Sequence, residues 1–243
     1  MAALAADSLR NRLATACRIL AAEGLVAGVL GHVSARGPAG EVLVRCRGPY
    51  EGGLARTLAA DIHALDLDGN PLEEMSGWLA PNELHIHTEL YRQRPDVQAV
   101  VHAHPVEALL CGLAGLVPRP VFGAFNIPAL RIALAGIPIY PRSVLIARAE
   151  LAAEMAAAMG SSSVCLLRGH GITVVGASIE TATVTAVNLN VLYVTTLALH
   201  SLNAAPDQVP AEDLAELPDL GAAFDDAMAW NALAANASDR YRK

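Results

Sequence analysis

The chain has 243 residues, 53% of them hydrophobic, and a formal net charge of −7 at pH 7. This length and composition allow a substantial core, and no linker rich in Gly, Ser or Pro divides the chain, so we expect a single domain over residues 1–243. The acidic balance, without a run of Lys or Arg, argues against a nucleic-acid or anionic-membrane surface and favours a small-molecule substrate.

The cysteines and the amino-terminal segment bear on the cellular compartment. The cysteines show no C-x-x-C spacing, which fits reduced thiols packed in a core better than a disulfide framework; they are Cys17, Cys46, Cys111 and Cys165. Residues 1–7 lack the basic start and the apolar centre of a signal peptide. We therefore expect a cytoplasmic protein.

The first half of the chain alternates helical and extended patterns. Apolar residues at helical spacing predict a helix that begins at Asp7 or Ser8 and stops at Gly24. A second helix is predicted over residues 82–94, with Asn82 as its cap. Short strands separated by turns of Gly and Pro are expected between the two helices, over residues 29–35, 42–46 and 62–67.

The second half continues this alternation. The expected elements are a strand around His102 followed by a helix, an extended segment over 137–140, a helix over 147–159, a hairpin around His170 and a long helix over 178–201. The long helix is apolar, but Glu180, Asn188 and Asn190 favour a core or interface helix over a membrane span. Mixed strands and helices without a regular βαβ repeat predict a layered α/β or α+β domain, with a peripheral tail from about residue 204.

Three histidines have the pattern of a metal site. His102 and His104 alternate along an apolar strand, so both imidazoles point to the same face. His170 lies between Gly169 and Gly171, where the backbone can turn sharply and expose the ring. Neutral imidazoles are common ligands of a catalytic divalent metal that keeps a position open for substrate. The alternative is that the rings are hydrogen-bonded inside the core.

Taken together, four segments resemble the class II aldolase and adducin family. The similarity runs from the first helix through the four segments in family order, and its specificity comes from their combination. The segments are Gly31-His32-Val33-Ser34, Asn82-Glu83-Leu84-His85-Ile86-His87, residues 94–104 and Leu166-Leu167-Arg168-Gly169-His170-Gly171.

The resemblance implies a fold and a metal centre. The implied fold is α/β, a three-layer α/β/α domain with a central, largely antiparallel sheet, usually in a homotetramer whose active sites lie at subunit interfaces. The implied ligands of one divalent metal per subunit are His102, His104 and His170, with Mn²⁺, Zn²⁺ and Fe²⁺ all open. Glu83 is implied either to complete the coordination or to move a proton to and from the substrate. No family pattern makes His85 or His87 a ligand.

The sequence departs from the family pattern where sugar-phosphate enzymes bind phosphate. The small hydroxyl and amide residues of that pattern are mostly replaced, with His32 at the asparagine position and Arg45-Cys46-Arg47-Gly48 in the second segment. Arg45 and Arg47 on alternate strand positions predict a paired guanidinium site, which suits a planar carboxylate. The alternatives are a solvated strand edge, or a phosphate held by arginine in place of serine.

This combination resembles the decarboxylase branch of the family, which acts on hydroxylated aromatic dicarboxylates such as hydroxypyridine dicarboxylates and dihydroxyphthalate. Retro-aldol cleavage and loss of CO₂ beside a phenolic oxygen both break a carbon–carbon bond and leave electrons that a metal can stabilise. We expect Glu83 to act as acid/base and His32 to donate to the substrate or to orient it. Arg45 and Arg47 are expected to anchor a second carboxylate, and Gly48 and Arg142 are the other expected substrate-binding residues. The alternative for Arg142 is an ordinary surface arginine.

Two other functions remain open at this point. A metal-dependent aldolase that cleaves a non-phosphorylated hydroxy or oxo acid would use the same histidines and Glu83, with the arginines on its carboxylate. A non-catalytic scaffold like the adducin head domain predicts loss of the metal histidines, and all of them are present.

Overall fold

The structure is a computed structural model that describes residues 2–221 and 224–240. Its strands are β1 (His32–Arg36), β2 (Val42–Arg45), β3 (Ile62–Leu65), β4 (Ala99–Ala103), β5 (Ile139–Tyr140), β6 (Val164–Leu167) and β7 (Gly171–Gly176). Its α-helices are α1 (Ala2–Ala22), α2 (Leu84–Gln93), α3 (Val106–Ala114), α4 (Ile127–Ala135), α5 (Ala149–Met159), α6 (Ile179–Ser201), α7 (Ala211–Glu216) and α9 (Trp230–Arg240). Short helical turns η1 (Leu54–Arg56), η2 (Ala59–Asp61) and η3 (Phe224–Ala229) complete the described elements.

The strands form one mixed sheet with the order β3-β2-β1-β4-β7-β6-β5. Every neighbouring pair is antiparallel except β5 and β6, which are parallel. In the register of β1 and β4, His32 lies opposite His102. The predicted α/β fold with a largely antiparallel central sheet is confirmed, and the pairing already brings two of the expected site residues together.

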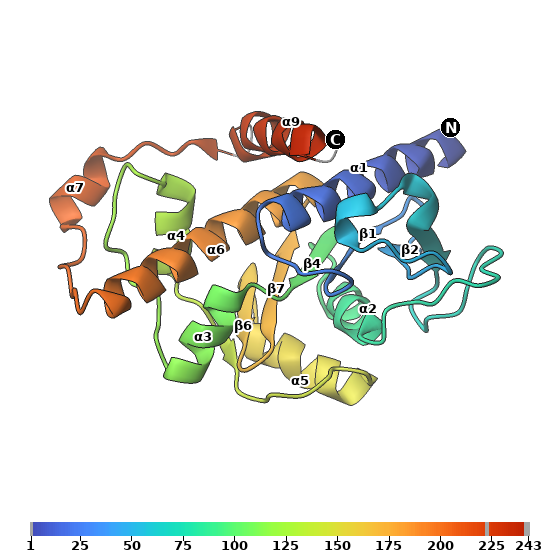
Figure 1. Cartoon of the computed structure of the whole chain (residues 1–243), viewed down its shortest axis with the longest axis horizontal. Helices are drawn as coiled ribbons and strands as arrows, with labels where there is room; N and C mark the ends of the chain where they lie inside the picture. Colours follow the sequence, from blue (N-terminus) through green and yellow to red (C-terminus); the bar gives the residue numbers. More distant parts are fainter. Residues whose placement is uncertain (1, 222–223, 241–243) are drawn as a thin grey trace.

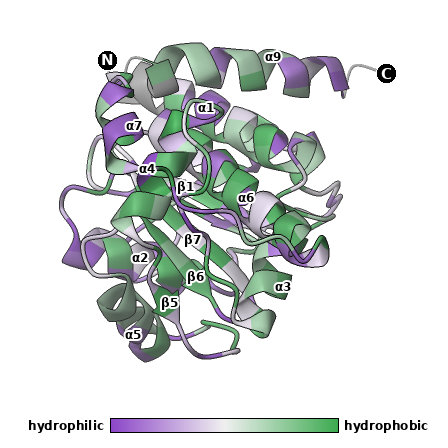
Figure 2. Cartoon of the chain, turned by 90° about the vertical axis from the view of Figure 1, so that its left-hand side faces the viewer, coloured by the Kyte–Doolittle hydropathy of each residue, from purple (hydrophilic) through white to green (hydrophobic). Residues whose placement is uncertain are grey.

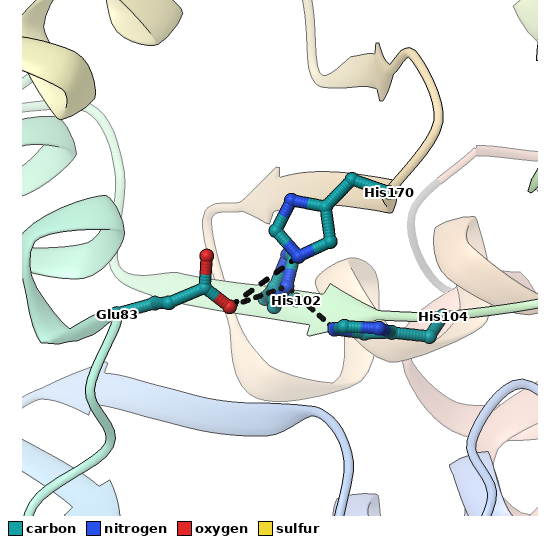
Figure 3. Close-up of side chains that lie close together, drawn as sticks. All are labelled: Glu83, His102, His104 and His170. Atoms are coloured by element: carbon teal, nitrogen blue, oxygen red, sulfur yellow. Dashed lines mark hydrogen bonds and ion pairs between the residues drawn. The ribbon is translucent and has the colours of Figure 1, made fainter. Parts of the chain in front are cut away.

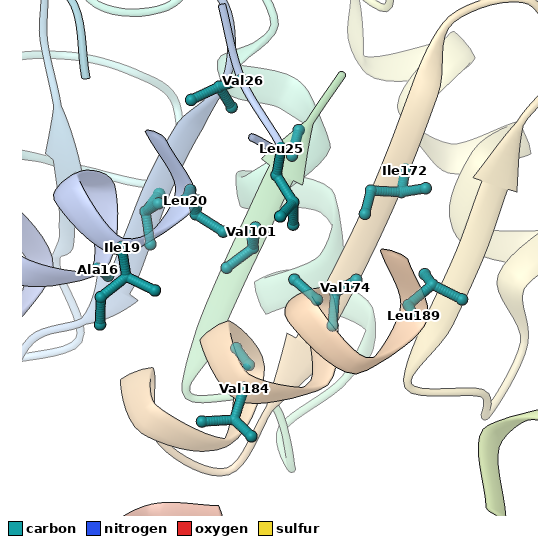
Figure 4. Packing of buried hydrophobic residues seen from close by; sticks show 14 of the residues in the cluster. Ala16, Ile19, Leu20, Leu25, Val26, Val101, Ile172, Val174, Val184 and Leu189 are labelled. Atoms are coloured by element: carbon teal, nitrogen blue, oxygen red, sulfur yellow. The ribbon is translucent and has the colours of Figure 1, made fainter. Parts of the chain in front are cut away.

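Helices cover both faces of the sheet (Figure 1), because the side chains of each strand alternate between two apolar layers. Val101 and Ala103 of β4 pack with α1 and α6 in the first core cluster, which Figure 4 shows from close by. Val100 packs on the opposite face with α2 and α5. His102 shares that second face, so the site histidines lie between the sheet and the second helical layer. Figure 2 shows the apolar colouring that runs along β6 and β7 between the helices.

Several boundaries differ from the sequence-based predictions for local reasons. The strand expected from residue 29 begins at His32, and Val29 and Leu30 lie in the preceding loop, about half exposed. The strand expected to reach residue 67 ends at Leu65, because the Asp66 carboxylate accepts backbone hydrogen bonds from the turn that follows it. The second helix begins at Leu84 with Glu83 in the cap position, so the prediction of Asn82 as the cap is wrong.

The long apolar helix and the tail both contribute to the core. α6 has the length and composition of a membrane-crossing helix, but its inner residues, such as Leu189, pack in the first core cluster. Part of the tail expected to be peripheral is not: Trp230 of α9 is 8% exposed and joins the same cluster. α9 also packs on α1, where Arg240 donates to the carbonyl of Ala22. The four cysteines are free and buried, as expected of packing residues.

Candidate metal centre and active site

One polar cluster on the second face of the sheet gathers the predicted metal ligands (Figure 3). One ligand atom from each of Glu83, His102, His104 and His170 lies within 4.8 Å of the others. Glu83 Oε2 is 3.4 Å from His102 Nε2 and 3.4 Å from His170 Nε2, and His104 Nε2 is 2.9 Å from His102 Nε2. The structure therefore brings together the residues that the sequence-based resemblance named.

The backbone explains why these rings converge. His102 is in β4 and His104 lies two residues further on the same side, while His170 is in the turn of the β6–β7 hairpin. Gly169 adopts a φ of +69° in that turn, which a residue with a side chain rarely adopts. At Gly171 an added Cβ would lie 2.2 Å from the carbonyl oxygen of Ala103, so the hairpin and β4 can approach closely only with glycine there.

The Glu83 side chain faces the histidine cluster instead of the start of helix α2. Glu83 occupies the cap position of α2, but in the described chain its side chain makes no capping hydrogen bond to that helix. Instead Oε1 accepts the backbone N–H of Ile146 at 2.8 Å, which leaves Oε2 directed at the histidines. Burial opposes ionisation of this carboxyl, but the neighbouring imidazoles outweigh burial and hold its pKa well below the ordinary range. Glu83 is therefore an anion in the cluster.

The environment favours the neutral form of two of the histidine rings, those of His102 and His104. Burial, reinforced by neighbouring imidazoles, lowers the pKa of His104 to about 3, and burial also lowers the pKa of His102. His102 Nδ1 lies 3.1 Å from the carbonyl oxygen of Ile172 and His102 Nε2 lies 3.4 Å from Glu83 Oε2. With its proton on Nε2 the ring donates to Glu83, and with its proton on Nδ1 it donates to Ile172 and turns the Nε2 lone pair toward the cluster. A neutral imidazole with its free nitrogen turned inward is the form that binds a metal.

The donor set fits a divalent cation. Donor atoms around a tetrahedral metal with bonds of about 2.1 Å are separated by about 3.4 Å, and Glu83 Oε2 lies 3.4 Å from two of the Nε2 atoms. The inward nitrogens of His102 and His104 also face one another at 2.9 Å. One carboxylate and three imidazoles would leave a position open in an expanded shell. The cluster is therefore a candidate metal site, and its chemistry does not select one metal.

A cavity opens beside this cluster. Its lining includes His32, Arg45, Arg47, Glu83 and His104. Its volume is about 130 Å³, close to the roughly 150 Å³ of an apolar cavity that admits benzene. The cavity can therefore hold one aromatic ring next to the metal cluster, with two guanidinium groups at its wall.

The two arginines have different partners, although both line the cavity. Arg45 ends β2 with a side chain only 4% exposed, and its guanidinium is paired with the carboxylate of Glu51. Arg47 donates to the side-chain oxygen of Asn82 at 2.9 Å. Because Asn82 is neutral, Arg47 keeps its full positive charge available to a ligand, whereas Glu51 neutralises much of the charge on Arg45.

The remaining expected substrate contacts lie outside this cavity in the described chain. Gly48 packs against the Trp78 ring, where an added Cβ would lie 2.6 Å from it, and lines a neighbouring cavity that Arg45 also borders. Arg142 forms an ion pair with Glu154 on α5 at 2.5 Å. The structure thus brings Arg45 and Arg47 to the metal cluster but leaves Gly48 and Arg142 apart from it.

Sequence reasoning missed a buried hydrogen-bonded row behind His32. His32 Nδ1 is 2.6 Å from His87 Nε2, His87 Nδ1 is 2.6 Å from Ser34 Oγ, and Ser34 Oγ is 2.7 Å from the Tyr91 hydroxyl. The available signal was spacing: His32 and Ser34 alternate on a strand, and His87 and Tyr91 are separated by one helical turn. Glu51, the partner of Arg45, had no such signal because it lies in a loop.

Comparison with known proteins places this geometry in a family. The model of the class II aldolase and adducin N-terminal domain matches residues 11–196. The chain belongs to this family. Among its relatives, the 3,4-dihydroxyphthalate decarboxylase of Arthrobacter keyseri is 51% identical over 91% of this chain and 90% of the relative. The enzyme of the same name from Terrabacter sp. (strain DBF63) is 48% identical over 91% of this chain and 93% of the relative.

A solved structure agrees with the fold. An aldolase II superfamily protein from Pseudomonas syringae superposes with a TM-score of 0.80 at 23% identity, over 98% of this chain and 94% of that protein. The predicted class II aldolase-like architecture is confirmed by this likeness and by the family match. The prediction of a carbon–carbon lyase from the decarboxylase branch is confirmed by the two relatives above.

Proposed function

We propose that this class II aldolase family member is a divalent-metal-dependent decarboxylase of a hydroxylated aromatic dicarboxylate, with 3,4-dihydroxyphthalate as the first substrate to test. The observation that carries the proposal is the position of the Glu83 and histidine cluster beside a ring-sized cavity bordered by two arginines. The relatives named for that reaction are 51% and 48% identical to this chain in sequence, which supports the same substrate class.

Each residue of the site then has a role. His102, His104 and His170 would hold the metal, which when bound supplies a Lewis acid for an oxygen of the substrate. Arg47 binds the carboxylate that is retained, with Arg45 contributing to the same wall of the cavity. His32, which lines the same cavity, donates a hydrogen bond to the substrate.

Glu83 is the acid/base of the proposed reaction. As an anion it takes the proton of a ring hydroxyl and returns that proton to the ring carbon that bears the departing carboxylate. The carbon–carbon bond then breaks, CO₂ leaves, and its bonding electrons restore the aromatic ring. One proton from water restores the ring hydroxyl, so the reaction consumes one proton for each CO₂ released.

The finer properties of the protein are part of the same proposal. We propose Mn²⁺, Zn²⁺ or Fe²⁺ as the metal, one per subunit, in a single-domain cytoplasmic enzyme that assembles as a homotetramer. An exposed apolar row on α3, formed by Val106, Leu110 and Leu113, supports an interface between subunits. We further propose that Arg142, which lies outside the cavity of its own chain, contacts the substrate of a neighbouring subunit, and that Gly48 acts through the loop beside Arg45.

The deciding experiment is a substrate panel. Metal-reconstituted protein and an EDTA-treated control are assayed for CO₂ release from ortho-hydroxy aromatic dicarboxylates, and for pyruvate or aldehyde release from 4-hydroxy-2-oxo acids. Metal-dependent CO₂ from the aromatic panel alone is the expected result. Release of pyruvate or aldehyde instead would replace the proposal with the aldolase alternative, and no turnover of any compound would refute the substrate class.

A further inference from the structure

The buried row behind His32 has a direction that can be worked out from its protons. Ser34, His87 and Tyr91 are 0%, 0% and 3% exposed, so water does not compete for their hydrogen bonds. The three separations along the row, from His32 to Tyr91, are 2.6, 2.6 and 2.7 Å. One hydrogen atom fits between each pair, and each link must therefore have one donor and one acceptor.

Tyr91 sets the first link. Its ring is anchored by Arg36, whose guanidinium lies 4.9 Å above the ring centre and donates to the Tyr91 carbonyl at 2.8 Å. Burial raises the pKa of the Tyr91 hydroxyl, so it keeps its proton. Among the residues that the structure describes, Ser34 Oγ is the side-chain acceptor within reach of that proton. The Tyr91 hydroxyl therefore donates to Ser34.

The other links follow from this first one. Ser34 accepts from Tyr91, so its own proton is directed at His87 Nδ1, which must be the unprotonated nitrogen of that ring. The proton of His87 is then on Nε2 and is donated to Nδ1 of His32. Nδ1 of His32 therefore accepts, and the proton of a neutral His32 ring is on Nε2.

We propose that Tyr91, Ser34 and His87 are positioning residues that hold His32 in its Nε2–H tautomer, as a hydrogen-bond donor for an anionic oxygen of the substrate. This inference rests on the proposed function for the identity of the acceptor, because His32 lines the substrate cavity. The reverse tautomer would present a lone pair to that oxygen and repel it. The row thus makes donation by His32 the default, without a conformational change on binding.

A pair of tyrosine variants tests the proposal. Tyr91→Phe removes the hydroxyl that orients the row and leaves the ring in place. Tyr193→Phe is the matched control, because Tyr193 is also buried and its hydroxyl has no hydrogen-bond partner within the described part of the chain. Ser34→Ala provides a second break in the row if Tyr91→Phe does not fold.

The primary measurement is the histidine tautomer, read from ¹⁵N–¹H correlation spectra of ¹⁵N-histidine-labelled protein, both metal-free and zinc-loaded. We expect Nε2–H for His32 and His87 in the wild type and in Tyr193→Phe, and a shift toward Nδ1–H in Tyr91→Phe or Ser34→Ala. An Nδ1–H tautomer of His32 in the wild type, or unchanged tautomers in both row variants, would overturn the proposal.

Kinetics supply the second measurement. Loss of one aligned hydrogen bond to the reacting complex corresponds to a drop in kcat of about tenfold, and we expect KM to change much less. Equal kcat values for Tyr91→Phe and Tyr193→Phe would overturn the effect on turnover. If the wild type decarboxylates no aromatic substrate but the tautomers behave as expected, the proposed function fails and the assignment of the row stands.

Discussion

The different partners of Arg45 and Arg47 predict opposite consequences of removing them. Arg47 contacts the neutral side chain of Asn82, which is exposed and can bond to water in its place. Replacing Arg47 by Ala should therefore leave the fold intact and remove one charge-assisted hydrogen bond to the substrate. Such a bond contributes about 1.5–3 kcal/mol, which corresponds to a rise in KM of roughly 10- to 150-fold.

Removing Arg45 should instead destabilise the protein. Its partner Glu51 is 19% exposed, and one oxygen of that carboxylate already lacks a hydrogen-bond partner among residues 2–221 and 224–240. Arg45→Ala would leave this carboxylate with the backbone N–H of Gly53 but without its charged partner, at a cost near the lower end of the range of about 3–5 kcal/mol seen for buried pairs. The double variant Arg45→Gln with Glu51→Gln removes both charges and should recover much of that stability.

Two assays separate these effects. Urea unfolding followed by circular dichroism gives the free energy of unfolding, and initial rates of CO₂ release at varied substrate give kcat and KM. The expected pattern is a high KM with normal stability for Arg47→Ala, and low stability for Arg45→Ala. If Arg45→Ala keeps wild-type stability and raises KM as much as Arg47→Ala does, the reasoning from the Glu51 pair is refuted.

Three further predictions concern the metal, the pH dependence of stability and the hairpin. His102→Ala should lower the metal bound per chain, measured by elemental analysis after dialysis, while His200→Ala outside the cluster should not; equal metal content would contradict the assignment. Burial opposes ionisation of Glu180, but its ion pair with Arg12 outweighs burial and lowers the pKa of the carboxyl. Because its pKa is lowered in the folded state, ionised Glu180 stabilises the fold at pH values above the ordinary carboxyl pKa, and this stabilisation is lost as pH falls through the folded-state pKa. Glu180→Gln should therefore lower the free energy of unfolding by about 1 kcal/mol at pH 7 and by progressively less below a pH of about 4. Urea unfolding of the wild type and of Glu180→Gln at pH 7 and below a pH of about 4 checks this, and the same difference in unfolding free energy at both pH values would contradict it. Gly171→Ala would place a Cβ 2.2 Å from a backbone oxygen of β4 and should lower both the Tm and the bound metal, and an unchanged Tm would show that the strands can separate there.

The sequence by itself determined the parts of the site that depend on local periodicity. Alternation on a strand directs His102 and His104 to the same face whatever the rest of the chain does. Glycines on either side of His170 allow the tight hairpin turn that presents its ring, and the φ of +69° at Gly169 shows why that residue type is needed. Helices α1, α2, α3, α5 and α6 and most strands also followed from apolar spacing, although α1 begins at Ala2, ahead of the predicted start at Asp7 or Ser8. Helices α4, α7 and α9 were not predicted.

The tertiary structure alone decided which partners these side chains meet. The sequence signals at Glu83 suited a charge at a helix start, and only the approach of the Ile146 backbone turns its carboxylate toward the histidines. Arg45 and Arg47 alternate in sequence, but a loop carboxylate from Glu51 neutralises one of them. His87 became the partner of His32 because packing α2 on the sheet closes a separation of 55 residues. Local spacing sets the direction of a side chain, whereas its charge balance and its hydrogen bonds come from segments that only the folded chain brings near.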